Sequence, residues 1–138
     1  MKKFLPLLIL TLVASACASK PKGSSTVLGK VTVINEYGSD ITKYCRANID
    51  KTGLFSQSAG TGSNGLEQIT CINGGDVYRI KGNRLSVNVP AENSTVDFGT
   101  VEITLNGDAS YKVSGGDGKI SVGDTTKGWS KHDTRNIR

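Results

Sequence analysis

The sequence predicts an all-β protein, a small antiparallel domain of about seven or eight strands, and three observations lead to this class. Residues 27–122 contain short apolar runs that alternate with polar residues, the period of a half-buried strand. Clusters of Gly, Asn and Asp separate the runs, and 17 of the 138 residues are glycine. Only 36% of the residues are hydrophobic, and hardly any window has a helical period. A chain of this length buries one core, so we expect a single domain.

Residues 1–16 have the features of a secretory signal peptide. Lys2 and Lys3 precede the apolar run 4–13, and residues 14–16 are small. The apolar run is about half the roughly 20 residues that span a bilayer. We therefore predict a segment that is cleaved after export rather than a transmembrane helix.

The ending of this signal, Ala14, Ser15 and Ala16 followed by Cys17, resembles the lipobox of bacterial lipoproteins. The resemblance implies that Cys17 becomes the mature N-terminus and carries a diacylglyceryl group and an N-acyl chain such as palmitate. Several acyl chains make membrane attachment long-lived. Ala18 stands where an Asp commonly retains such proteins in the inner membrane, so the resemblance implies an outer-membrane anchor, on the periplasmic or the surface face. Because Ala14 replaces the usual Leu, cleavage by ordinary signal peptidase is the alternative.

Residues 17–26 are small, polar and basic, and we expect them to form a lipidated tether that reaches at most about 30 Å. The domain follows over residues 27–122. Its first strands are expected at 27–34 and 41–50, with a turn between them. The polar stretch 51–65 is expected to be a loop that turns Leu54 and Phe55 inward.

The second half of the domain is expected to contain more hairpins. Residues 66–72 and 77–81 alternate around the turn cluster Asn-Gly-Gly-Asp, which favours a hairpin. In the long run 95–105 the apolar parity reverses at Gly99, which indicates a β-bulge. Further strands are expected at 85–89, 111–113 and 120–122, the last two paired across a glycine-rich turn.

Two cysteines remain once Cys17 is assigned to lipid. Cys45 and Cys71 both fall on the apolar side of their strands, and an even pair in an exported domain favours a disulfide. Closing a loop of roughly 27 residues would stabilise the domain by about 3 kcal/mol. The alternative is a metal site, but the lone His132 lies far away in the sequence, so we expect no metal and no cofactor.

Several short motifs between residues 29 and 105 resemble those of carboxypeptidase-regulatory-like, or transthyretin-like, domains. They are GKVTV at 29–33, EYGSDI at 36–41, TGSNG at 61–65, GDVYRI at 75–80, and a final strand motif over 89–103. The resemblance implies an antiparallel β-sandwich that binds proteins or serves as a spacer. An outer-membrane lipoprotein with such a domain occurs as an assembly subunit of type VI secretion systems.

Charge and residue inventory exclude several functions. The formal net charge is +5, but Lys2 and Lys3 contribute two of these charges, and no basic run is interleaved with aromatics, so nucleic acid is not an expected partner. Ser130, His132 and Asp133 are the residue types of a hydrolase triad, but consecutive tail residues cannot hold its geometry. We expect no catalytic residues and no enzymatic activity.

The remaining hypotheses are two kinds of envelope lipoprotein. One is a structural, assembly or protein-interaction subunit that contacts other envelope proteins. The alternative is a module that binds a glycan or another surface ligand. Because the aromatic residues do not alternate on any one strand, the first hypothesis is favoured.

Residues 123–138 form a polar, basic tail that lacks a strand pattern. Trp129 lies among Lys127, Lys131 and Arg135, and an aromatic side chain with basic neighbours can bind a partner or anionic lipid. Packing of Trp129 on its own domain is the alternative. On the first interpretation the tail is mobile and its deletion leaves the fold intact.

Overall fold

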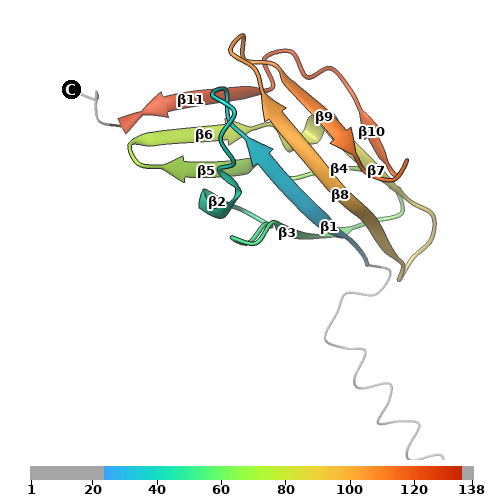
Figure 1. The fold of residues 1–138 in the computed structure, drawn as a ribbon. Coiled ribbons are helices and arrows are strands. Elements are labelled where there is room, and N and C mark those ends of the chain that lie inside the picture. The colour runs from blue at the N-terminus through green and yellow to red at the C-terminus, as the bar shows by residue number, and fades with distance from the viewer. Residues whose placement is uncertain (1–23, 135–138) are drawn as a thin grey trace, which may run out of the picture.

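The computed structural model describes residues 24–134, and these residues form an all-β fold that is consistent with a β-sandwich, as predicted (Figure 1). The described strands are β1 (Ser25–Ile34), β2 (Cys45–Arg46), β3 (Leu54–Ala59), β4 (Gly62–Gly65), β5 (Ile69–Asn73), β6 (Asp76–Ile80), β7 (Leu85–Val89), β8 (Thr95–Leu105), β9 (Tyr111–Gly115), β10 (Ile120–Val122) and β11 (Trp129–Asp133). Two short 3-10 turns, η2 (Thr42–Tyr44) and η3 (Gly82–Arg84), precede β2 and β7. None of the helical turns in residues 24–134 could cross a membrane.

The strands form three sheets. Sheet A has the order β3-β1-β8-β9, sheet B the order β11-β6-β5-β2, and sheet C the order β10-β7-β4. The central pair of sheet A, β1 and β8, is parallel, and the other strand pairs are antiparallel. A parallel pair needs a long crossover connection. Here the connection from β1 to β8 contains strands β2 to β7, which form most of sheets B and C and the edge strand of sheet A.

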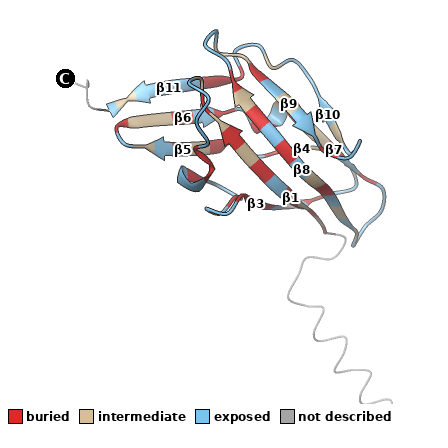
Figure 2. Ribbon diagram, viewed as in Figure 1, coloured by how far each residue is buried: buried red, intermediate tan, exposed pale blue. Residues whose placement is uncertain are grey.

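One hydrophobic core joins the three sheets (Figure 2). Alternate residues of β1 are buried, as are alternate residues of β7, which matches the alternation in the sequence. The largest fully buried side chains include Phe55 and Phe98 from sheet A, Tyr78 and Ile80 from sheet B, and Leu85 from sheet C. The side chains of three sheets therefore share one interior.

The predicted β-bulge at Gly99 is confirmed. Leu28 of β1 pairs with Asp97 of β8, but Lys30 pairs with Thr100, so Phe98 and Gly99 together oppose one residue. Gly99 has a φ of +73°, a conformation that favours glycine. The extra residue restores the inward parity of the following apolar residues.

The strand that we expected over residues 41–50 is largely absent, and this prediction was wrong. The backbone NH of Val33 donates to Thr42 Oγ1 (2.9 Å), and the Asp40 carboxylate accepts from the NH of Thr42 (2.9 Å). These bonds favour the 3-10 turn, so only Cys45–Arg46 forms a strand, and Ile49 makes an isolated bridge with Phe55. Ala47 and Asn48 then have positive φ values, which ends the strand.

The polar stretch 51–65 forms strands β3 and β4 instead of the expected loop. Phe55 is buried as predicted, but Leu54 is 60% exposed, because neighbouring residues of a strand point to opposite faces. Pairing with β1 places β3 at the edge of sheet A, and pairing with β7 places β4 at the edge of sheet C. The local sequence lacks an apolar pattern, so the partner strand determines its conformation.

The expected hairpin between residues 111–113 and 120–122 does not form. β9 pairs with β8 in sheet A, whereas β10 pairs with β7 in sheet C. The four residues from Gly115 to Gly118 all have positive φ values, and they carry the chain from one sheet to the other.

The segment that we expected to be a mobile tail contains strand β11, which corrects the domain boundary at residue 122. Trp129–Asp133 pairs with β6 at the edge of sheet B. The NH of Lys81 donates to Gly128 O (2.8 Å), which joins the start of β11 to the end of β6. The sandwich therefore extends through Asp133, and the structure predicts that removing this strand destabilises the domain.

Candidate functional site

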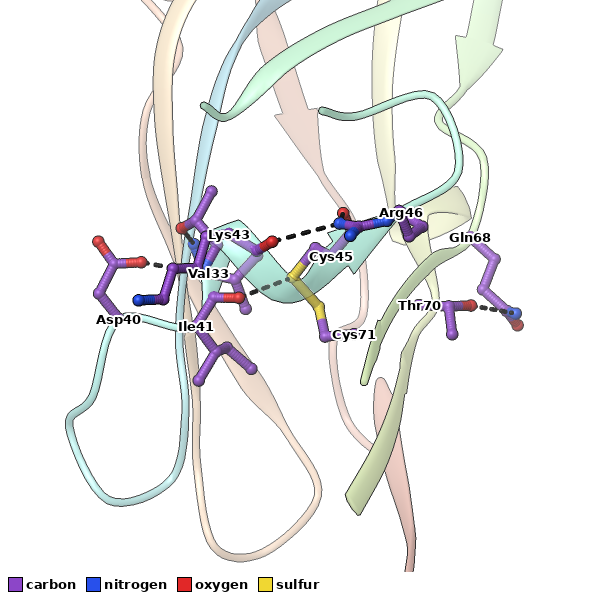
Figure 3. Close-up of a disulfide and its surroundings, with 10 residues drawn as sticks. Val33, Asp40, Ile41, Lys43, Cys45, Arg46, Gln68, Thr70 and Cys71 are labelled. Atoms are coloured by element: carbon purple, nitrogen blue, oxygen red, sulfur yellow. Dashed lines mark hydrogen bonds between the residues drawn. A yellow bond between two sulfur atoms is a disulfide. The ribbon is translucent and has the colours of Figure 1, made fainter. Parts of the chain in front are cut away.

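The predicted disulfide between Cys45 and Cys71 is confirmed (Figure 3). The two residues face each other on β2 and β5, and both side chains are fully buried. Cys45 Sγ lies 3.4 Å from Ile41 O, beneath the 3-10 turn. Since β2 has only two residues, the disulfide is the covalent link that holds this short edge strand to sheet B.

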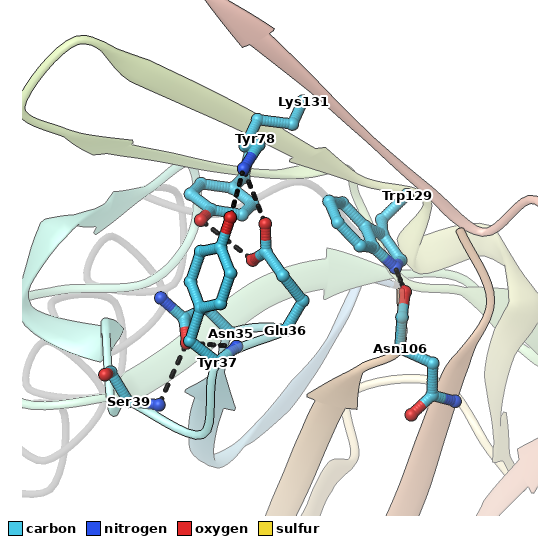
Figure 4. Close-up of polar contacts among 8 residues, drawn as sticks. All are labelled: Asn35, Glu36, Tyr37, Ser39, Tyr78, Asn106, Trp129 and Lys131. Carbon is cyan, nitrogen blue, oxygen red and sulfur yellow. Dashed lines mark hydrogen bonds and ion pairs between the residues drawn. The ribbon is translucent and has the colours of Figure 1, made fainter. Parts of the chain in front are cut away.

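Trp129 is a core residue in the structure rather than an exposed anchor. Its side chain is only 8% exposed, and its ring lies 5.7 Å from that of Tyr78, centroid to centroid. The indole Nε1 donates to the carbonyl oxygens of Asn106 (3.0 Å) and Ser110 (2.8 Å), as Figure 4 shows for Asn106. The hypothesis that this indole contacts a partner is therefore not supported. Its NH is hydrogen-bonded within the domain, and its ring packs against Tyr78.

Lys131 belongs to a group of four side chains that we call the corner cluster, made of Glu36, Tyr37, Tyr78 and Lys131. Lys131 Nζ lies 2.6 Å from Glu36 Oε2 and 3.4 Å from the Tyr37 hydroxyl. The Tyr78 hydroxyl donates to Glu36 Oε1 (2.9 Å). Lys131 Nζ also lies 5.2 Å from the centroid of the Tyr37 ring and 5.6 Å from that of Tyr78 (Figure 4). Cation–π attraction therefore adds to the ion pair.

Burial and charge shift the protonation equilibria of this cluster. Burial alone would raise the pKa of the Glu36 carboxyl, but the hydrogen bonds from Lys131 and Tyr78 hold that pKa below its usual value. Burial and the nearby Glu36 carboxylate raise the pKa of Tyr78 to about 12. The hydrogen bond to Glu36 raises the pKa of Lys131. At neutral pH the cluster is a charged pair beside a neutral phenol.

The loop after β1 carries Tyr37 in a defined conformation. The side-chain oxygen of Asn35, a buried residue, accepts from the NH groups of Tyr37 (3.0 Å) and Ser39 (2.9 Å). Tyr37 itself is 75% exposed. An exposed tyrosine on a fixed loop is a good contact residue, because little side-chain entropy is lost on binding.

The remaining predicted site residues are not gathered at the corner cluster. Lys127 is exposed in the turn before β11, with a positive φ. Cys17 and Arg135 lie outside the described residues. Ser130 and His132 point to one face of β11 and Asp133 to the other, as strand alternation requires. Within residues 24–134, no three His, Cys, Asp or Glu side chains are placed to hold a metal ion.

Sequence reasoning missed Glu36, Tyr37 and Tyr78 as members of a site. Glu36 and Lys131 are 95 residues apart in the chain, and no motif relates them. Only the pairing of β11 with β6 brings Lys131 opposite Tyr78. In comparisons with known proteins, the chain matches no family model, no curated protein and no solved structure.

Proposed function

We propose that this protein is an exported lipoprotein, anchored in the outer membrane through Cys17, that acts as a structural, assembly or protein-interaction subunit of an envelope complex. The signal-like residues 1–16 and the lipobox resemblance at Cys17 support the anchor. The resemblance to transthyretin-like domains supports a binding rather than a catalytic role, with a secretion or surface complex as the setting.

The observation that carries the proposal is the position of the exposed apolar side chains relative to the tether. Strand β1 begins at Ser25, where the tether enters, and its ten residues extend for about 30 Å. Tyr37 (75% exposed) follows its far end, and Ile72 (52%) and Tyr44 (36%) lie on β5 and η2, whereas Leu54 (60%) and Val122 (50%) lie on β3 and β10. With an anchored N-terminus, the end of β1 that carries the Tyr37 loop lies about 30 Å from the start of the strand, where this loop is available to other envelope components.

Binding of a surface glycan is less well supported. Carbohydrate recognition uses exposed aromatic rings along a groove. An open groove of about 390 Å³ crosses β3, β1 and β8, but its exposed apolar residue is Leu54 and its aromatic residue, Phe55, is buried. The groove therefore lacks the ring faces on which a sugar would stack.

The anchor is tested by lipid analysis of the full-length protein made in a bacterial host with two membranes. We expect metabolic incorporation of labelled palmitate, the corresponding intact mass, and loss of both in Cys17→Ser. The matched control, Cys45→Ser with Cys71→Ser, should retain the label. An unlabelled protein that is cleaved at another position contradicts the anchor.

The interaction role is tested by photocrosslinking in intact cells of the source organism. A photoreactive residue at Tyr37 should give a discrete protein adduct, whereas the same residue at Ser114, on the outer face of β9, serves as the control position. Adducts with polysaccharide alone would favour the glycan-binding alternative. Absence of protein adducts from every tested face would contradict an interaction role.

A further inference from the structure

The outer face of sheet B differs in charge from the inner face that contacts the core. Strand alternation places one set of side chains on this outer face, which we call the basic face. Its strand residues are Arg46, Thr70, Ile72, Val77, Arg79, Ser130 and His132, and we include Gln68 directly before β5 and Lys81 directly after β6. Three of these residues, Arg46, Arg79 and Lys81, are basic, and none is Asp or Glu.

The arginines of the basic face lie in one cross-strand row. Arg46 of β2 pairs with Thr70 of β5, which pairs with Arg79 of β6, so the two arginines are separated by two strand spacings, about 10 Å. Arg46 Nη1 donates to the carbonyl oxygens of Cys45 (2.8 Å) and Lys43 (3.2 Å), which restrains its guanidinium. Within residues 24–134, neither Arg79 nor Lys81 makes a side-chain hydrogen bond or ion pair.

An apolar strip adjoins this row. Ile72 is 52% exposed and pairs with the half-buried Val77, which pairs with His132 of β11. Arginine next to exposed aliphatic residues is typical of protein interfaces, because the guanidinium binds carboxylates in a planar, two-point geometry while the apolar neighbours exclude water. An anionic membrane attracts lysine equally well and does not require such geometry.

We infer that the basic face docks an acidic surface of a partner protein, with partner carboxylates at Arg46 and Arg79 and an apolar partner side chain at Ile72. Charge complementarity selects this partner, because the face carries two arginines on strands of fixed register and no acidic residue of its own. The inference rests on the proposed interaction role and adds the surface and the chemistry of the partner.

The experiment combines photocrosslinking with charge reversal in the full-length protein in its own cells. A photoreactive residue at Ile72 should give a protein adduct whose crosslinked segment, sequenced by mass spectrometry, contains Asp or Glu. Arg79→Glu should lower the adduct yield about tenfold, and Arg79→Gln should lower it by less. The matched control Lys112→Glu, on the exposed outer face of β9, should leave the yield unchanged. Thermal unfolding of each variant verifies that the domain is folded.

The outcomes separate this inference from the proposed function. Protein adducts at Tyr37 or Ser114 but not at Ile72 would overturn the basic face and leave an interaction role in place. An adduct at Ile72 that is insensitive to Arg79→Glu, or whose segment has no acidic residue, would overturn the charge argument. A third outcome would also overturn the inference of a protein partner. In it, purified protein binds phosphatidylglycerol vesicles, Arg79→Glu abolishes that binding, and no protein adduct forms at Ile72, so the anion is a lipid.

Discussion

Lys131 Nζ and Glu36 Oε2 are 2.6 Å apart and join the last strand of the sandwich to the loop after the first. The two side chains are partly buried, at 27% and 10% exposure, and the phenol of Tyr78 donates to the other carboxylate oxygen. Ion pairs of this kind are worth more than fully exposed pairs because water screens them less.

The first prediction concerns this pair. In a double-mutant cycle, Glu36→Gln and Lys131→Met should show a coupling of about 0.5–1 kcal/mol in the free energy of unfolding, measured with urea at pH 7. Glu36→Gln combined with Lys112→Met, an exposed lysine on β9, should be additive. A coupling equal to that of the control pair would show that the contact contributes nothing to stability.

The same pair predicts a pH dependence. Since hydrogen bonds lower the pKa of Glu36 in the folded state below its usual value of 4.5, its contribution to stability is complete above that pH. The contribution is lost as the pH falls through the folded-state pKa. Urea unfolding between pH 7 and pH 3 should therefore show a smaller acid loss of stability in Glu36→Gln than in the wild type. Parallel profiles for the two proteins would contradict this assignment.

The burial of Trp129 predicts a large effect of its truncation. Trp129→Ala removes a buried ring and two hydrogen bonds, so the free energy of unfolding should fall by about 3–5 kcal/mol. The control Val122→Ala, at a side chain that is 50% exposed, should change it by less than about 0.5 kcal/mol. A chain truncated after Asp124 should also be destabilised. If that truncated chain were as stable as the full chain, β11 would not belong to the cooperative unit.

The disulfide predicts a local as well as a global effect. Replacing Cys45 and Cys71 by alanine should lower the free energy of unfolding by about 3 kcal/mol, because the unfolded chain is no longer closed across 26 residues. Amide exchange should rise most in the segment from Ile41 to Ile49, since β2 has only two residues to pair with β5. Uniform exchange along the whole chain would mean that the disulfide does not hold this segment in particular.

Gly29 predicts a packing requirement. A Cβ at this position would clash with Cε1 of Phe98, whose ring is fully buried. Gly29→Ala should therefore destabilise the domain by about 1–3 kcal/mol in urea unfolding. Gly107→Ala, where a Cβ would meet no atom within 4 Å, is the matched control. Addition of Phe98→Leu should recover part of the loss, and a failure to recover would point away from this contact.

The sequence by itself determined the strands whose apolar residues alternate strictly. The inward parity of β1 and β7, the bulge at Gly99 and the cysteine pairing follow from local alternation and from the number of cysteines. These features depend on a period of two residues, which a strand imposes whatever its partner.

The tertiary structure decided the edge strands and the corner cluster. Half of β3 and most of β11 are polar, and their extended conformation comes from pairing with β1 and β6. The contact between Glu36 and Lys131 depends on that pairing, because it joins residues that no local pattern relates. In β11, backbone hydrogen bonds to β6 order a segment whose one buried side chain is that of Trp129. A single sequence does not show which strand a polar segment will pair with.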